Sequence, residues 1–171
     1  MIPEIKKILY ATDLTKNSSY AFFYAVTMAE KCGATIVILH SVEAGRHISY
    51  AGAGVEAVMG GAKKQEQEAD IEKIKERLEA ICKTMEKHVG HSCLELVSKI
   101  IVPLGHPVEE ILRAVKEEEC DVIVLGTHGK GFLKQTLLGN VAARVLQRTR
   151  KPVFIIPLPS EKTDIDWYSM P

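Results

Sequence analysis

The sequence has no net charge, no long apolar run and no secretion signal, and each absence excludes a class of protein. Lys and Arg number 22, as do Asp and Glu, so no overall field attracts polyanions and we do not expect nucleic acid as a partner. No apolar run approaches a membrane-spanning length, and the first residues lack an apolar core followed by a small-residue cleavage site. We therefore expect a cytoplasmic protein that does not bind membranes.

Cysteine is also scarce, and no CxxC pair occurs. The four cysteines are Cys32, Cys82, Cys93 and Cys120. Their wide spacing fits buried thiols in a reducing compartment better than a disulfide framework. His88, His91 and Cys93 lie close together in sequence, but three ligands in one turn are not a tetrahedral set, so we expect no metal site.

Strand-like and helix-like segments alternate along the 171 residues, which suffice for one well-buried core. Expected strands are short β-branched or apolar runs at 7–11, 35–40, 94–102, 121–125 and 153–156. Expected helices show apolar residues at three- and four-residue spacing, over 17–32, 65–89, 107–118 and 140–148. This alternation predicts an α/β fold: a single doubly wound parallel sheet with right-handed crossovers and helices on both faces.

Two segments lack this periodicity. Residues 43–64 carry scattered glycines among small residues, and we expect a flexible excursion, with a lid over the site as one option. Residues 159–171 read as a C-terminal tail. The sequence thus predicts one domain over 1–158, followed by the tail.

The stretch from Gly126 to Asn140 carries the strongest functional signal. Gly126 and Gly129 follow an expected strand, and Gly139 precedes an expected helix. Glycines let main-chain N–H groups approach an anion closely, and a helix start offers unpaired N–H groups and a positive dipole end. We therefore expect two backbone segments to close around a phosphate.

Asp13 and Ser41 lie just past the first two expected strands, at the same sheet edge as the glycines. Ligands of open parallel sheets bind outside the carboxyl ends of the strands, where strand order reverses. Asp13 could accept hydrogen bonds from a ribose hydroxyl or a base amine. The alternative for Asp13 is a cap for the following helix.

These residues resemble the universal stress protein family. Gly126-x2-Gly129-x9-Gly139-Asn140 is similar to the G-x2-G-x9-G-[ST] motif of its ATP-binding branch, and ILYATD and ILHSVE resemble its first two strands with their exits. The resemblance covers about residues 6–157. It implies five strands in the order 3-2-1-4-5, an adenine-nucleotide alpha-hydrolase-like fold, ATP or a related adenine nucleotide (ADP or AMP), and a homodimer paired through the last strand.

The resemblance also implies roles for individual residues. Thr12 and Asp13 match positions that meet adenine and ribose, and Ser41 matches a backbone position at the adenine ring. The remaining matches contact ribose and phosphates: Leu125, Gly126, Gly129, Gly139, Asn140, Val141 and Ala142. Asn140 stands where the motif has Ser or Thr, and Ala142 lacks a hydroxyl that some relatives supply.

Lys130, with Lys134 and His128, could neutralise phosphates from the loop, and the alternative is a solvated polar surface. Mg²⁺ could accompany the phosphates. No GxSxG elbow, HExxH or Walker lysine occurs, and no base is placed for the γ-phosphate, so we expect no catalytic residues. The sequence predicts a stress-response regulator that acts as an ATP-dependent switch on an unknown protein partner. The alternatives are an interaction protein without nucleotide and a slow ATPase.

Overall fold

Strands and helices alternate along the chain as the sequence predicts. The computed structural model describes residues 2–43, 60–90, 92–127 and 138–157. The elements are β1 (Lys7–Ala11), α1 (Lys16–Cys32), β2 (Thr35–Leu39), α2 (Gly60–Val89), the 3-10 helix η1 (Leu94–Leu96), β3 (Val97–Ile101), α3 (Pro107–Glu117), β4 (Val122–Gly126), α4 (Asn140–Arg148) and β5 (Val153–Ile156).

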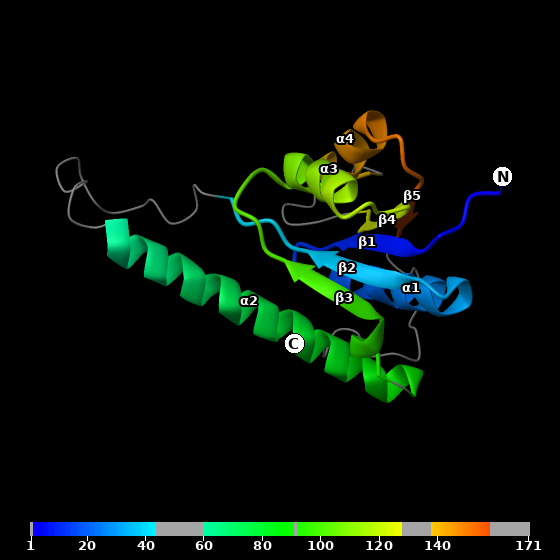
Figure 1. Cartoon of the computed structure of the whole chain (residues 1–171), viewed down its shortest axis with the longest axis horizontal. Helices are drawn as coiled ribbons and strands as arrows, with labels where there is room; N and C mark the ends of the chain where they lie inside the picture. The colour runs from blue at the N-terminus through cyan, green and yellow to red at the C-terminus, as the bar shows by residue number, and fades with distance from the viewer. Residues whose placement is uncertain (1, 44–59, 91, 128–137, 158–171) are drawn as a thin grey trace.

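The five strands form one parallel sheet in the order β3-β2-β1-β4-β5 (Figure 1). Strand β1 lies at its centre, with Leu9 opposite Val37 of β2 and Ile123 of β4. The fold class and strand order predicted above are confirmed. Strand order reverses at β1 and β4, so the topological switch point lies between these two strands.

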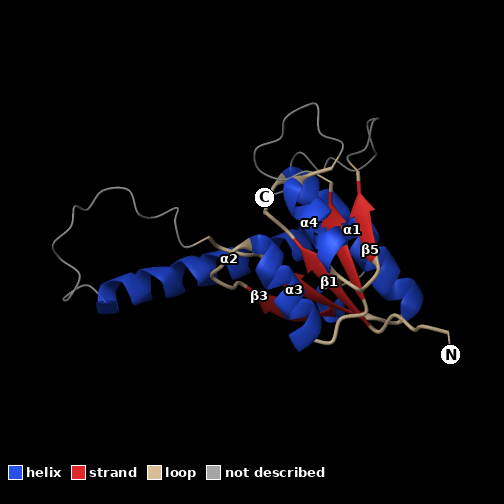
Figure 2. Ribbon diagram, turned by 90° about the horizontal axis from the view of Figure 1, so that it is seen from above, coloured by secondary structure: helices blue, strands red, loops and turns tan. Residues whose placement is uncertain are grey.

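Side chains along each strand point alternately to the two faces of the sheet, which divides the core into two layers. Ile8 and Tyr10 of β1 belong to the layer that α1 and α2 cover, whereas Leu9 and Ala11 belong to the layer that α3 and α4 cover. Figures 1 and 2 show the two pairs of helices on opposite faces. Strands buried on both faces must be apolar throughout, which explains the runs of Val, Ile and Leu.

Two element boundaries differ from the sequence predictions by more than one residue. Helix α2 begins at Gly60, inside the expected 43–64 excursion, and its N-terminal half extends beyond the sheet (Figures 1 and 2). The expected strand at 94–102 is wrong for its first three residues, which form η1. Leu94 and Leu96 pack against the core from this turn, so their apolar character reflects burial rather than strand pairing.

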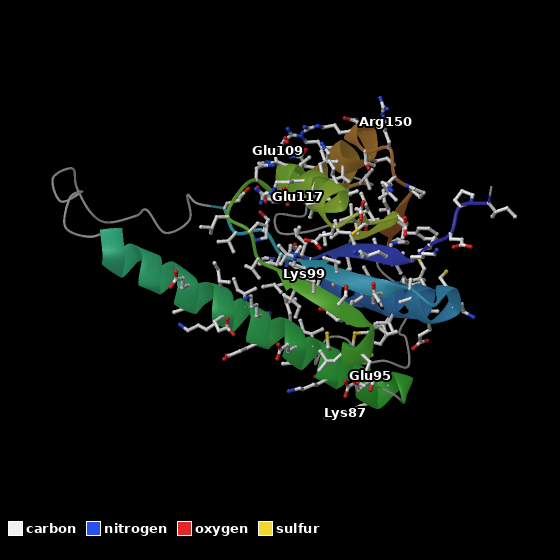
Figure 3. The ribbon with its side chains drawn as sticks, viewed as in Figure 1. Lys87, Glu95, Lys99, Glu109, Glu117 and Arg150 are labelled. Atoms are coloured by element: carbon white, nitrogen blue, oxygen red, sulfur yellow. The ribbon has the colours of Figure 1, made fainter. Side chains whose placement is uncertain are left out.

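Ion pairs and hydrogen bonds connect neighbouring elements at the surface of the domain. Oδ2 of Asp121 accepts hydrogen bonds from the N–H groups of Lys6 (2.8 Å) and Lys7 (3.0 Å), which joins the start of β1 to the start of β4. Glu109 of α3 pairs with Arg148 of α4. The charged side chains labelled in Figure 3, Glu109 among them, lie on the outside of the domain.

Candidate functional site

The predicted site residues that the structure describes lie at the carboxyl end of the sheet. Thr12 and Asp13 follow β1, Ser41 follows β2 after one residue, and Gly126 ends β4. From β1 the chain enters α1 on one face, whereas from β4 it continues to α4 on the other face. The two connections therefore diverge at the switch point, where sheets of this kind bind ligands in a crevice.

The turn between β1 and α1 is held by its own side chains. Asp13 Oδ1 accepts hydrogen bonds from Thr15 N–H (3.0 Å) and from Thr15 Oγ1 (2.6 Å). Thr15 in turn is the N-cap of α1, and its side chain accepts from Ser18 N–H. Thr15, and not Asp13, is therefore the cap of α1, and Asp13 fixes the position of Thr15. The same contacts hold the Asp13 carboxylate in place at this end of the sheet.

Thr12 is buried and connects this turn to its neighbours. Its Oγ1 accepts from Leu14 N–H (3.0 Å) and lies 2.7 Å from Ser18 Oγ. Its main-chain N–H donates to Leu39 O (2.9 Å), and its carbonyl accepts from Nδ1 of the buried His40 (2.8 Å). A carbonyl can only accept, so His40 carries its proton on Nδ1. No signal in the sequence predicted this anchoring role of His40.

Ser41 has main-chain groups that face the β1 side of the sheet. The N–H groups of His40 and Val42 donate to Ile101 O (3.0 Å) and Pro103 O (2.9 Å), both on the β3 side. Because successive residues of an extended chain direct their main-chain groups to opposite sides, the N–H and C=O of Ser41 point toward the exit of β1. The Ser41 hydroxyl donates to Gly105 O at 2.6 Å, which fixes this segment.

The glycine loop begins and ends at fixed points. Thr127 N–H donates to Ile156 O at 3.0 Å, and Gly139 N–H donates to Thr127 O at 2.6 Å. Residues 128–137 between them lie outside the described part of the chain, so the predictions for Gly129 and Lys130 stay predictions, as do those for His128 and Lys134. The loop thus starts and ends beside the crevice.

Helix α4 presents its N-terminus at this end of the sheet. Gly139 is its N-cap, with φ −65° and ψ 153°, and the first helical hydrogen bond runs from Ala143 N–H to Gly139 O. Helix geometry leaves the N–H groups of Asn140, Val141 and Ala142 without an intrahelical acceptor. The side chain of Ala142 is buried, whereas Asn140 is exposed.

The dihedral angles of Gly139 do not require glycine. A φ of −65° with ψ near 150° is open to every L-residue, whereas Gly33 and Gly90 take positive φ values of 64° and 87° at the ends of α1 and α2. The backbone conformation at position 139 therefore does not require glycine.

Tyr10 is buried beneath the turn between β1 and α1, and its burial changes the pKa of its hydroxyl group. Burial raises the pKa of the Tyr10 hydroxyl well above its usual value, while hydrogen bonds with Thr12 and Ser18 lower it by less. The hydroxyl therefore stays protonated and donates to Ser18 O at 2.6 Å. It acts as a fixed support for the β1–α1 turn.

Gly105, His106 and Pro107 border the same edge. His106 is the N-cap of α3 and accepts from Val108 N–H through Nδ1, and Pro107 occupies the first turn, as the sequence predicts. A Cβ on Gly105 would lie 2.4 Å from Glu110 Oε1. The glycine therefore makes room for the buried carboxyl group of α3.

Other features lie away from these residues. A surface hollow of about 280 Å³ is lined by Lys75 and Glu79 of α2 and by residues 94 and 97–100, and no predicted site residue contributes to it.

Within the described ranges, no three His, Cys, Asp or Glu side chains gather as a metal site needs, and His91 lies outside them. No described helix is long and apolar enough to cross a bilayer.

Comparison with known families agrees with this arrangement. A model of the universal stress protein family (Usp) matches residues 4–157. The chain belongs to the universal stress protein family. Among curated relatives, Universal stress protein MJ0577 of Methanocaldococcus jannaschii is 30% identical over 158 residues, which cover 88% of this chain and 94% of that protein. Universal stress protein YxiE of Bacillus subtilis is 29% identical over 150 residues, covering 88% and 97% of the two chains.

Solved structures share the fold. The structure of MJ0577 superposes with a TM-score of 0.69 at 27% identity and covers 93% of this chain and 100% of its own. UspA of Lactobacillus plantarum gives a TM-score of 0.68 at 19% identity, with 91% and 99% covered. A universal stress protein in complex with cAMP gives 0.59 at 17% identity, with 92% and 100% covered. At these identities the last two show the fold alone.

Proposed function

We propose that this universal stress protein belongs to the ATP-binding branch of the family and acts in the cytoplasm as a nucleotide-dependent regulator. The observation that carries the proposal is the presence of three unlike groups at the carboxyl end of the sheet. The main chain of Ser41 suits a base, and the carboxylate of Asp13 suits a sugar. The N-terminus of α4 suits a phosphate chain.

The base would lie against Ser41. Adenine places an amine donor beside a ring-nitrogen acceptor, whereas guanine has a carbonyl acceptor where adenine has the amine. The adjacent N–H and C=O of Ser41 face the β1 side, as the bonds of His40 and Val42 require. The Ser41 C=O can accept from the adenine amine while its N–H donates to the ring nitrogen. Guanine would place its carbonyl oxygen against the Ser41 C=O, and two acceptors cannot form a hydrogen bond.

The ribose would lie at Thr12 and Asp13, beside Leu125 and Gly126 at the end of β4. An ionised carboxylate accepts hydrogen bonds from hydroxyl groups, and the Thr15 contacts hold that of Asp13 in one orientation. Such preorganisation lowers the entropic cost of binding.

The phosphates would lie before α4. The N–H groups of Asn140, Val141 and Ala142 and the positive dipole end favour an anion, and Gly139 leaves the approach open. Asn140 supplies an amide where the family motif has a hydroxyl, and it remains a hydrogen-bond donor. Bound ATP would bring its own phosphate-linked Mg²⁺.

A likeness of fold gives this proposal a precedent. One universal stress protein of similar fold is known in complex with cAMP. We propose that the present chain shares the capacity of that protein to bind an adenine nucleotide.

Titration calorimetry of the purified protein tests the proposal. We expect ATP to bind with a stoichiometry near one per chain, and GTP to bind at least about tenfold more weakly because of the mismatch at Ser41. Acid extraction of freshly purified protein should release an adenine nucleotide. Absence of both binding and released nucleotide would contradict the proposal.

A second function, protein interaction without nucleotide, is favoured by one observation. The N–H of Gly139 is already bonded to Thr127 O, and Asp13 Oδ1 to Thr15, so part of the donor and acceptor set is engaged within the chain. The calorimetry separates the two functions, because only the first predicts heat on addition of ATP.

We also propose a homodimer paired through β5. This strand lies at the sheet edge, and the carbonyls of Pro152 and Ile156 accept from the β4 side. By alternation, the main-chain groups of Val153 and Ile155 point outward, where a second copy of β5 could pair with them. Phe154 is 45% exposed on the same strand. Light scattering at micromolar concentration should show a dimer, and a monomer would contradict this proposal.

A further inference from the structure

Leu14, next to Asp13, has a backbone conformation that its side chain disfavours. Its φ is 62°, and Glu119 is the only other non-glycine residue with positive φ in the described part of the chain. This left-handed region costs an ordinary L-residue about 1–2 kcal/mol, so other contacts must hold the turn.

Two hydrogen bonds hold the peptide groups on either side of Leu14. Its N–H donates to Thr12 Oγ1 at 3.0 Å, and its carbonyl accepts from Nη2 of Arg77 at 3.3 Å. The first bond lies within the turn, whereas the second comes from α2, 63 residues further along the chain. Among the described residues, Arg77 therefore provides a link from a separate element to this strained turn.

Arg77 links the position of helix α2 to the conformation of the turn between β1 and α1. The side chains of Leu78 and Ile81, on the same helix, are buried in the layer that also contains Tyr10 of β1. The guanidinium of Arg77 thus extends from a fixed point of the helix, although the side chain itself is exposed. Helix α2 also directly follows residues 44–59, which begin just after Ser41 in the sequence.

We propose that Arg77 is a positioning residue for the nucleoside end of the site: it fixes the Leu14 carbonyl and thereby the orientation of the Asp13 carboxylate. The inference rests on the proposed function, because Asp13 is taken to bind ribose. Arg77 touches no part of the nucleotide in this scheme. Its effect should reach the sugar and base but not the phosphates, which lie at α4.

The test compares Arg77→Ala with Arg77→Lys and with Lys83→Ala, a matched loss of an exposed cation on the same helix. Calorimetry with ATP and with inorganic tripolyphosphate supplies the first readout. We expect Arg77→Ala to weaken ATP binding about three- to tenfold, the range for one hydrogen bond, and to leave tripolyphosphate binding unchanged. Arg77→Lys should recover part of the loss, because an ammonium group can still donate to the Leu14 carbonyl.

Two outcomes of the binding measurements would overturn the inference. Arg77→Ala could bind ATP as tightly as Lys83→Ala, or it could lose ATP and tripolyphosphate equally, which would indicate a loss of general positive charge. Amide NMR spectra of the nucleotide-free protein supply a second readout, which does not depend on ligand. The signals of Asp13, Leu14 and Thr15 should shift in Arg77→Ala and not in Lys83→Ala.

The spectra also separate the inference from the proposed function. A wild-type protein that binds no ATP would remove the proposed function, yet the shifts of residues 13–15 would still show whether Arg77 orders the turn. Unchanged spectra in Arg77→Ala would overturn the inference whatever the protein binds.

Discussion

The main-chain N–H of Gly139 donates to the carbonyl of Thr127 at 2.6 Å, so the two ends of the glycine loop meet beside the crevice. This bond positions the N-terminus of α4 against the end of β4. It also engages the Gly139 N–H itself, which leaves the next three amides of α4 as the donors for a phosphate. The role of Gly139 in binding is then to leave space rather than to donate.

Gly139→Val tests that role. The φ and ψ of Gly139 suit valine, so we expect the free energy of unfolding to change by less than about 1 kcal/mol. A branched side chain before α4 should nevertheless weaken ATP binding by at least about tenfold, because it blocks the approach to the amides. Calorimetry and urea denaturation measure the two effects, and unaltered ATP affinity would place the ligand elsewhere.

Asp13→Asn and Asp13→Ala separate the two roles of this carboxylate. Asparagine keeps an oxygen for the Thr15 contacts, so Asp13→Asn should fold normally but hold ribose less well. Alanine loses both contacts and should cost about 1 kcal/mol in the free energy of unfolding as well. Both variants should bind adenosine more weakly than the wild type, because a hydrogen bond to ribose is weakened or lost. Equal nucleoside affinities in wild type and both variants would leave Asp13 a purely structural residue.

Asp121 gives the fold a pH dependence in the acid range. Burial alone would raise its pKa, but hydrogen bonds from the N–H groups of Lys6 and Lys7, with nearby lysine charges, lower it below its usual value. Its folded pKa thus lies below the unfolded value, so its contribution to stability is full above the unfolded pKa, about 4, and is lost as pH falls through the folded pKa.

Asp121→Asn should therefore destabilise the protein at pH 7 and approach wild type near the folded pKa. The difference should not exceed about 1 kcal/mol, because solvent screens this partly exposed group. Urea denaturation at a series of pH values from neutral to acid measures it. A difference that stays constant with pH would mean that the charge of Asp121 does not contribute.

The cysteines should differ sharply in reactivity. Burial is the main cause that raises the pKa of Cys82 to about 12 and those of Cys93 and Cys120 to about 11, whereas Cys32 is exposed at the end of α1. Since the thiolate is the nucleophile, iodoacetamide at pH 8 should modify Cys32 first in the native protein. Mass spectrometry should find all four modified in urea. Early modification of Cys82 in the native protein would contradict its burial.

The sequence predicts most of the fold because local signals and tertiary packing agree. The bounds of β1, α4 and β5 match their apolar runs, and Gly33 ends α1 with a positive φ, as expected of a helix stop. The start of α2 was not predicted, because Gly60 and Gly61 have low helix propensity and read as loop. The bounds of η1 were not predicted either, because leucines that pack a turn against the core give the same apolar signal as a strand.

For the candidate site, the sequence predicted which residues follow the carboxyl ends of the strands, but not the hydrogen bonds between them. The exits of β1 and β2 and the glycine spacing point to one edge of a parallel sheet. The conformation of Leu14 could not be predicted, because leucine rarely has positive φ. The bond from Arg77 joins residues 63 apart, and only packing of α2 on the domain brings them together. The orientation of the Ser41 main chain likewise depends on how far β3 continues beside β2.

The order of strands delays completion of the crevice during synthesis. Central strand β1 gains its second neighbour only when β4 is made, and the Asp121 contacts to Lys6 and Lys7 span 115 and 114 residues. Contacts of such long sequence separation form slowly, and a nascent chain that ends before β4 has an open edge at β1. A truncated chain without β4, α4 and β5 would therefore leave one edge of β1 unpaired and lack part of the candidate site.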